Sequence, residues 1–561
     1  FSILREQAQA NLRGIVDELL ARDDITAGSA AQKIRDLYAS FMDEETIDDR
    51  GVTPVQPILD RIDAIERHRD LIEFLGFAPR MNIPVPIAPY VDQDGKDATR
   101  YLVHFTQWGL GMPDRDYYLE DDERLANIRT EYVAYIARLF ELAGVQANAT
   151  VVFDFETTLA KAQWSRVKNR DRELTYNLVA RDDLASTAPA LDWPALLHAA
   201  DLDEVDELIV RQPDYAAEVG ELTHSVPLAT WKAYLRFQTL DALAPYLSND
   251  FVEAHFDFHG RTLSGVEQLR PRWKRGIRLL NDSVGELLGQ LYVERYFKPE
   301  AKARMMELVG DLREAFHEAI DELPWMTAAT KAEAQKKLAK FNTKIGYPDV
   351  WRDYTALEIE PGDLLANLER IAEFEHRRDL AKLEGPVDRN EWFMPPQSVN
   401  AYYSSKMNEI VFPAAILQPP FFDPTVDDAV NFGAIGAVIG HEMSHGFDDQ
   451  GRKSDGDGNL RDWWTDEDAR RFEARAAKLV EQYAAYEPLP GQHINGILTL
   501  GENIGDVSGL AMAYRAWRLS LHGKPAPVID GMTGEQRFFL GWARAWRSKQ
   551  RDAALQRQLL T

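Results

Sequence analysis

Apolar residues recur at every third or fourth position through most of the first 347 residues, which is the spacing of one face of an α-helix. Pro and Gly residues separate the periodic segments. The pattern predicts helices over residues 1–22, 30–44, 57–76, 121–143, 154–166, 230–246, 265–292 and 299–322. Two short runs, 83–91 and 100–106, predict strands. We expect residues 1–347 to form a mostly helical lobe, with an approximate boundary and a chain that can cross between lobes more than once.

The pattern changes near residue 384. Segments rich in aromatic and β-branched residues predict the strands of a small sheet over 392–396, 399–404 and 410–414. An apolar, uncharged run then predicts a buried helix over 431–440, and later helices are expected over 498–510 and 534–558. We therefore expect a mainly α fold with a small β-sheet (α+β), in two lobes, the second over residues 384–561.

The strongest chemical signal follows the buried helix pattern directly, at His441-Glu442-Met443-Ser444-His445. On a helix, residues i and i+4 project from the same face, so both imidazoles can bind one Zn²⁺. H-E-x-x-H is a zinc-peptidase pattern in which the glutamate takes a proton from water. The alternative, two histidines on an ordinary amphipathic helix, fits poorly with the apolar run before them. We expect one zinc ion per chain, with Glu442 as the general base.

A catalytic zinc site needs a third protein ligand. The best candidate is Glu502, which shares a helix face with Asp506 four residues later. One carboxylate can bind the metal while the other accepts the N–H of a ligand histidine and fixes its orientation. Without the histidine motif, Glu502 and Asp506 would be interpreted as two acidic residues on the surface of a helix. His493 is a rival ligand, although the Gly and Asn residues around it favour a loop.

Several motifs together resemble the neprilysin-like (M13) zinc metallopeptidases. H-E-x-x-H is followed by Glu-Asn-Ile-Gly-Asp at 502–506, and further matches lie at 109–118, 344–348, 399–403 and 410–422. The resemblance covers the whole chain and is closest to actinobacterial members. It implies a thermolysin-like catalytic lobe beneath a large helical cap, with a cavity between them that admits oligopeptides and excludes folded proteins.

The resemblance also implies roles for individual residues. Zn²⁺ held by His441, His445 and Glu502 would lower the pKa of a bound water toward about 7, and Glu442 would take the proton as the water attacks a peptide carbonyl. Asn400 and Ala401 would hold the peptide as an added strand. An apolar S1′ pocket would select a large hydrophobic residue on the carboxyl side of the cleaved bond; its expected members, each of which could instead be ordinary core, are Phe1, Ile416, Phe421, Val438 and Trp546.

The function implied is therefore a zinc-dependent endopeptidase that hydrolyses oligopeptides on the amino side of large hydrophobic residues. Family members continue beyond the position of Thr561 with a segment H-S-P-x-x-x-R, whose histidine and arginine support catalysis. The alternative is a catalytically impaired, peptide-binding form, although an intact Glu442 favours the enzyme. An exopeptidase with the same metal site is a third reading.

Composition narrows the class of partner. A net charge of −27 and a pI near 4.9 argue against binding to nucleic acids or anionic membranes. The chain has no cysteine, so it has neither disulfides nor thiolate metal sites, and no run of apolar residues is long enough for a transmembrane helix. We expect a soluble, monomeric bacterial protein, cytoplasmic or exported.

Overall fold

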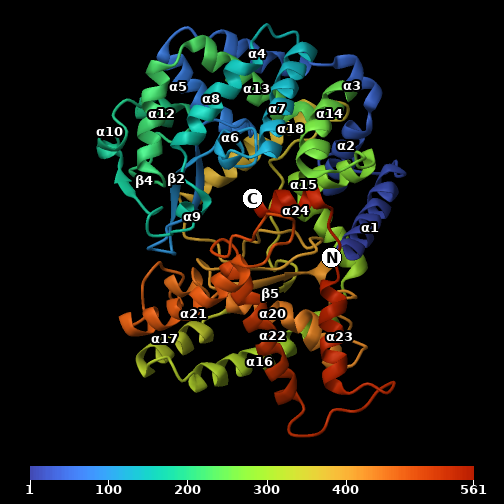
Figure 1. Cartoon of the computed structure of the whole chain (residues 1–561). Helices are drawn as coiled ribbons and strands as arrows, with labels where there is room; N and C mark the ends of the chain where they lie inside the picture. The colour runs from blue at the N-terminus through green and yellow to red at the C-terminus, as the bar shows by residue number, and fades with distance from the viewer. Residues whose placement is uncertain (561) are drawn as a thin grey trace.

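The computed structural model describes residues 1–560, which form an upper and a lower lobe (Figure 1). Helices dominate the upper lobe: α1 (Ser2–Leu20), α2 (Ala30–Met42), α3 (Glu44–Arg50), α4 (Gln56–Asp63), α5 (His68–Phe77), α6 (Asp116–Leu119), α7 (Glu123–Leu142), α8 (Ala149–Ala162), α9 (Arg166–Asn169), α10 (Leu184–Thr187), α11 (Trp193–Ala199), α12 (Pro213–Ser225), α13 (Leu228–Leu243), α14 (Asn249–His255), α15 (Arg272–Tyr296) and α18 (Leu364–Lys382). The amphipathic spacing in the sequence therefore produces a large helical body.

The upper lobe also contains a four-stranded sheet. Its strands, in the order β1-β2-β4-β3, are β1 (Ile87–Gln93), β2 (Tyr101–Gln107), β4 (Glu207–Val210) and β3 (Leu178–Ala180). β2 and β4 are parallel, and the other two pairs are antiparallel.

The lower lobe combines helices with a three-stranded sheet. Its helices are α16 (Pro299–Glu322), α17 (Ala328–Ala339), α19 (Asp428–Asn431), α20 (Ala437–Ser444), α21 (Asp466–Ala484), α22 (Leu500–Ser520) and α23 (Gly534–Trp546). The sheet has the order β5-β7-β6, with β5 (Asn342–Gly346) parallel to β7 (Glu409–Pro413) and β6 (Tyr402–Ser404) antiparallel to it. β6 is thus an edge strand.

The chain crosses between the lobes more than once. α16, α17 and β5 belong to the lower lobe, where α16 packs along α22, although they fall within the first 347 residues. α18 then returns to the upper lobe, and so does α24 (Asp552–Leu560), where Arg124 Nη1 donates to Gln556 Oε1 at 3.0 Å. Each lobe is therefore assembled from separate stretches of chain.

The predicted fold class is confirmed, but some element boundaries were wrong. Residues 57–76 form two helices, because Asp70 accepts the backbone N–H of Arg67 at 2.9 Å and starts α5 there. Pro271 delays the start of α15 to Arg272. Residues 392–396 form no strand, since two prolines at its end cannot donate to a sheet.

The predicted helix over 534–558 is also wrong as a single element, because α23 ends at Trp546 and α24 begins at Asp552. The residues between them are charged or polar and offer no apolar face to bury. Among the helices described between residues 1 and 560, none has both the length and the apolarity to cross a bilayer.

Glycines let α20 and α22 approach until their backbones touch. A Cβ atom at Gly440 would lie 2.4 Å from the carbonyl oxygen of Gly509, and one at Gly509 would lie 2.4 Å from the backbone nitrogen of His441. No side chain other than hydrogen fits at that distance. The sequence thus fixes how closely these two helices pack.

Candidate active site

The H-E-x-x-H motif lies at the end of a helical segment that runs through α19, a π-helical turn (Phe432–Gly436) and α20. This segment is buried almost throughout, as its apolar sequence predicts. α23 packs against the π-helical turn, where a Cβ atom at Gly433 would lie 1.9 Å from the carbonyl oxygen of Phe538. The packing fixes the end of α20, and with it the direction of both histidines.

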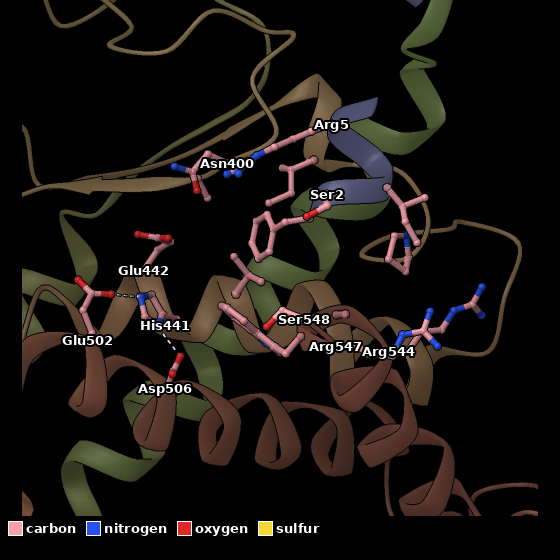
Figure 2. Close-up of a pocket in the computed structure, with 18 of the residues that line it drawn as sticks. Ser2, Arg5, Asn400, His441, Glu442, Glu502, Asp506, Arg544, Arg547 and Ser548 are labelled. Atoms are coloured by element: carbon pink, nitrogen blue, oxygen red, sulfur yellow. Dashed lines mark hydrogen bonds and ion pairs between the residues drawn. The ribbon is translucent and has the colours of Figure 1, made fainter. Parts of the chain in front are cut away.

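Three potential metal ligands, His441, His445 and Glu502, converge beside α20, and Figure 2 shows two of them, His441 and Glu502. The Nε2 atoms of His441 and His445 lie 3.0 Å apart, and their rings are nearly perpendicular at 89°. Glu502, in the first turn of α22, places Oε2 3.3 Å from His441 Nε2 and Oε1 3.9 Å from His445 Nε2. All three donor atoms lie within 4.8 Å of one another. Two imidazoles and one carboxylate are the donor set of a catalytic zinc site, so these residues fit Zn²⁺.

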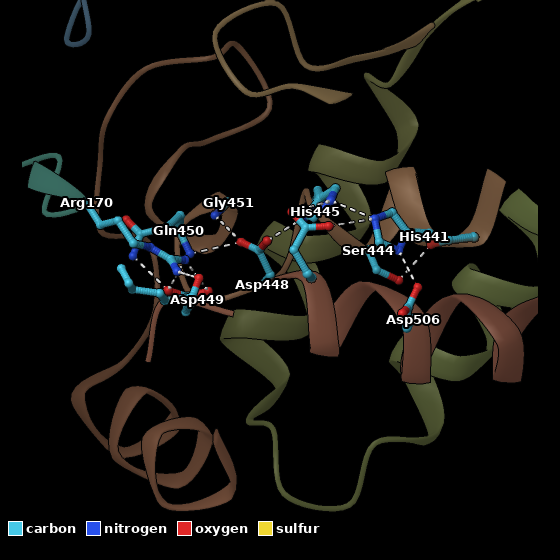
Figure 3. A network of polar contacts seen from close by, with 12 residues as sticks. Arg170, His441, Ser444, His445, Asp448, Asp449, Gln450, Gly451 and Asp506 are labelled. Carbon is cyan, nitrogen blue, oxygen red and sulfur yellow. Dashed lines mark hydrogen bonds and ion pairs between the residues drawn. The ribbon is translucent and has the colours of Figure 1, made fainter. Parts of the chain in front are cut away.

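Each histidine has its own carboxylate partner on the far side of the ring. His441 Nδ1 donates to Asp506 Oδ1 at 2.9 Å, and His445 Nδ1 donates to Asp448 Oδ2 at 2.8 Å (Figure 3). These bonds hold the Nε2 lone pairs toward Glu502. Asp448, the partner of His445, was not among the site residues predicted from the sequence. Its only signal is a position three residues after His445.

The electrostatics of the cluster favour positive charge. Burial lowers the pKa of His441, but hydrogen bonds with Asp506 and Glu502 outweigh burial and raise it to about 10. The pKa of His445 is also raised, since its bond with Asp448 outweighs the effect of burial. The hydrogen bond with His441 lowers the pKa of Glu502. Three carboxylates, those of Glu502, Asp506 and Asp448, thus contact the two histidines. A Zn²⁺ ion bound here would take the place of the histidine protons.

Glu442 lies against the histidines and lines the same cavity. Its side chain is buried, and this burial raises its pKa despite the two nearby histidines. A carboxylate with a raised pKa accepts a proton more readily near neutral pH. The structure therefore places a suitable base beside the candidate metal ligands.

The site opens into a cavity of about 880 Å³, which is lined by residues of the lower lobe and by residues at the start of α1. Asn400 and Ala401, which immediately precede the edge strand β6, form part of its wall. Of the five residues expected in the S1′ pocket, four line the cavity, namely Phe1, Ile416, Val438 and Trp546. Phe421 lies behind them, fully buried, with its ring centroid 4.6 Å from that of Phe1. The predicted site residues are thus gathered around one space.

A second cluster of metal-binding residue types lies in the upper lobe, at Asp241, His255 and His259. Here the histidine rings stack at 29°, and Asp241 already accepts hydrogen bonds from His259 at 2.9 Å and from Tyr135 at 2.5 Å. Stacked rings do not direct both lone pairs at one ion, so this cluster reads as a packed polar network. His493, the rival ligand, lies in an exposed loop and in neither cluster.

Comparison with known proteins agrees with this geometry. The sequence models of peptidase family M13 match residues 1–348 and 400–561. The chain belongs to peptidase family M13. Endothelin-converting enzyme 1 of Rattus norvegicus is 32% identical over 592 residues, which cover 100% of this chain and 76% of that enzyme. The endothelin-converting enzyme homolog of Locusta migratoria is 30% identical over 594 residues, covering 100% and 81%.

Solved structures of M13 peptidases share the whole fold. The Mycobacterium tuberculosis zinc metalloprotease ZMP1 in complex with an inhibitor is 48% identical, with a TM-score of 0.96 and coverage of 100% of this chain and 86% of that one. The open state of ZMP1 gives a TM-score of 0.77, with 88% of that chain covered. PEPO of Lactobacillus rhamnosis is 26% identical, with a TM-score of 0.89 and coverage of 100% and 88%. The predicted resemblance is confirmed, and the protein is an M13 metallopeptidase of a zinc-dependent family.

Proposed function

We propose that this M13 peptidase cleaves oligopeptides on the amino side of large hydrophobic residues, with His441, His445 and Glu502 as zinc ligands and Glu442 as the general base. The observation that carries the proposal is the shared cavity. Metal donors, base, edge strand and an apolar wall all border the same 880 Å³ space.

The edge strand supports an extended mode of substrate binding. β6 is paired on one side only, with β7, and its other side lies toward the cavity. A peptide can add there as a further strand, held by backbone hydrogen bonds from Ala401 and by the exposed amide of Asn400. This would lay the scissile carbonyl across the face of α20.

Zn²⁺ in this donor set supplies Lewis-acid polarisation of the peptide carbonyl and of water. Glu442 then takes a proton from the attacking water and delivers it to the leaving amine. Asp506 and Asp448 hold the two imidazoles in one tautomer and orientation while this charge moves. Removal of the base should therefore stop turnover without removing the metal ligands.

Side-chain selection is assigned to the apolar wall. The rings of Phe1 and Trp546 lie with centroids 5.5 Å apart, and Val438 lies one turn before His441 on α20. Because Val438 and a metal ligand share a helix face, this wall adjoins the bond to be cut. An apolar side chain on its carboxyl side is then buried on binding, which favours Phe, Leu or Ile there.

A quenched fluorogenic peptide library, varied at P1′, tests the proposal. We expect enrichment of Phe, Leu and Ile at P1′, loss of hydrolysis with phenanthroline, and recovery with added Zn²⁺. A flat P1′ profile would refute the specificity. Peptide binding without hydrolysis, with Zn²⁺ bound, would instead support the peptide-binding alternative. Product masses distinguish internal cleavage from removal of terminal residues.

A further inference from the structure

Arg170 joins the upper lobe to the loops that support the metal ligands. It ends the short helix α9, which the upper lobe holds through a hydrogen bond from Gln212 Nε2 to Asn169 Oδ1 at 2.9 Å. Its guanidinium extends into the lower lobe, where Nη2 lies 3.1 Å from Asp449 Oδ2 (Figure 3). The Arg170 and Asp449 side chains are only 26% and 16% exposed, so this ion pair is shielded from solvent.

The same guanidinium holds a second segment. Nη1 donates to the backbone carbonyl of Ile497 at 3.0 Å and to that of Leu498. These carbonyls immediately precede α22, whose first turn carries Glu502. Gly496 packs against the backbone of Val480, so the lower lobe also holds this loop. Arg170 therefore adds an anchor from the upper lobe.

The Asp449 end of the Arg170 contact lies in the loop that follows α20, the helix that carries the histidine ligands. Asp449 follows Asp448, which accepts the N–H of His445 with one oxygen and the backbone N–H of Gly451 with the other, at 2.8 and 2.6 Å. A Cβ atom built on Gly501 would lie within 3.5 Å of Asp448, Asp449 and Arg170, so the two loops meet at this point. One planar group thus ties together the supports of His445 and Glu502.

We propose that Arg170 is a positioning residue for the metal centre, which it clamps from the opposite lobe when the lobes are closed. The lobes here are arranged as in the inhibitor complex of ZMP1 rather than as in its open state. Closure would then both enclose a peptide and fix the relative positions of His445 and Glu502. The catalytic part of this inference rests on the proposed peptidase function.

Two roles of Arg170, as a nearby positive charge or as a group that positions the ligands, predict opposite effects on the rate of zinc dissociation. If Arg170 acted only as a positive charge near the ion, Arg170→Ala would relieve repulsion and slow zinc loss. If it positions the ligands, Arg170→Ala should speed zinc dissociation and lower kcat, each by up to about 10-fold, the lower end of the effect of losing a group bonded directly to a metal ligand, because Arg170 acts one contact further out. Arg170→Lys should not restore both the zinc dissociation rate and kcat, because a lysine ammonium cannot form the paired contacts of the guanidinium.

A matched control separates clamping from simple lobe closure. Lys406 also bridges the lobes, but it donates to Asp92 Oδ2 at 2.5 Å and to the Gln93 carbonyl at 2.7 Å rather than to the loops that hold Asp449 and Leu498. Lys406→Ala should raise KM and leave the zinc dissociation rate unchanged. Asp449→Asn should reproduce the effect of Arg170→Ala, and the double variant should be no worse than either single one.

The experiment is stopped-flow zinc transfer to a chromophoric chelator, alongside kcat and KM, on variants whose thermal unfolding matches wild type. Faster zinc loss in Arg170→Ala, absent in Lys406→Ala, supports the inference. An unchanged or slower zinc loss overturns it, as does an equal effect in both variants. The zinc measurement needs no hydrolysis, so a failure of the proposed peptidase function would be seen separately, as inactive wild-type protein that still shows the zinc effect.

Discussion

Asp448 and Asp506 occupy equivalent places around the metal ligands, although they come from different segments. Each accepts the Nδ1 proton of one histidine, at 2.8 Å for His445 and 2.9 Å for His441. Asp448 lies in the loop after α20, whereas Asp506 lies on α22, one turn after Glu502. The helix α22 therefore orients one histidine ligand, and the loop after α20 orients the other.

Replacing either aspartate should weaken zinc binding. For Asp448→Asn and Asp506→Asn we expect a loss of affinity of about 10- to 100-fold, because each histidine loses a charged acceptor that fixes its orientation. Competition with a fluorescent chelator measures the effect. Asp457→Asn, on an exposed residue paired with Lys340, is the control and should bind zinc normally. Normal affinity in the first two variants would contradict the assigned roles.

Replacing the proposed base should separate chemistry from metal binding. Glu442→Gln keeps the size and burial of the side chain but cannot accept a proton. We expect kcat to fall by about 10²–10⁴-fold with zinc content unchanged. Metal analysis and peptide hydrolysis on the same sample provide the measurement. Substantial activity in this variant would assign proton transfer to another group.

Filling the apolar wall should change which peptides are cut. Val438 lines the cavity, and Val438→Phe would occupy space needed by a large P1′ side chain. We expect kcat/KM to fall at least about 10-fold more for Phe than for Ala at P1′, since one methylene in such a pocket changes binding by about 1–3 kcal/mol. Val426→Phe, at an exposed position, is the control. Equal losses for both substrates would place the pocket elsewhere.

The buried Glu156 should make stability depend on pH. Burial raises its pKa to about 8, even though Tyr118, Tyr132 and Gln238 each donate to it at 2.7 Å. Between its ordinary pKa and about 8, the folded protein keeps a proton that the unfolded chain releases. The free energy of unfolding should therefore fall as pH rises through this window, by at most roughly 1.4 kcal/mol per pH unit.

Urea unfolding at several pH values between about 5 and 8 tests this dependence. Glu156→Gln cannot ionise and should remove the slope, whereas Glu120→Gln, at an exposed position, should retain it. A wild-type stability that stays level or rises over this range would show that Glu156 is ionised in the folded protein.

The contact between α20 and α22 should not tolerate a methyl group. In Gly509→Ala the new Cβ would lie 2.4 Å from the backbone nitrogen of His441, so the helices must separate. We expect a loss of about 1–3 kcal/mol in stability, together with weaker zinc binding. Gly310→Ala, where a Cβ atom meets nothing within 4 Å, is the control. Unchanged zinc affinity in Gly509→Ala would show that ligand spacing does not depend on this contact.

Local sequence patterns predicted the elements that they define, but not contacts between residues that lie far apart in the sequence. Helices such as α16 were predicted to the residue, because Pro299 and an uninterrupted apolar stripe define them locally. The motif around His441 and the pair formed by Glu502 and Asp506 follow from helix periodicity and from family resemblance. Arg170 carries no such signal, because Asp449 and Leu498 are hundreds of residues away in sequence and meet it only after the lobes pack.

The contacts between the lobes bear on the rate of turnover as well as on the size of the peptide that can bind. Hydrogen bonds such as Leu460 N to Gly95 O, at 2.6 Å, and Ala98 N to Asn459 Oδ1, at 2.8 Å, hold the two lobes together. If products leave by separation of the lobes, these bonds must break at each release and form again before the next cleavage. Turnover then has a ceiling set by how often the molecule opens. Added viscogen should lower that ceiling even for peptides whose bonds are easily cut.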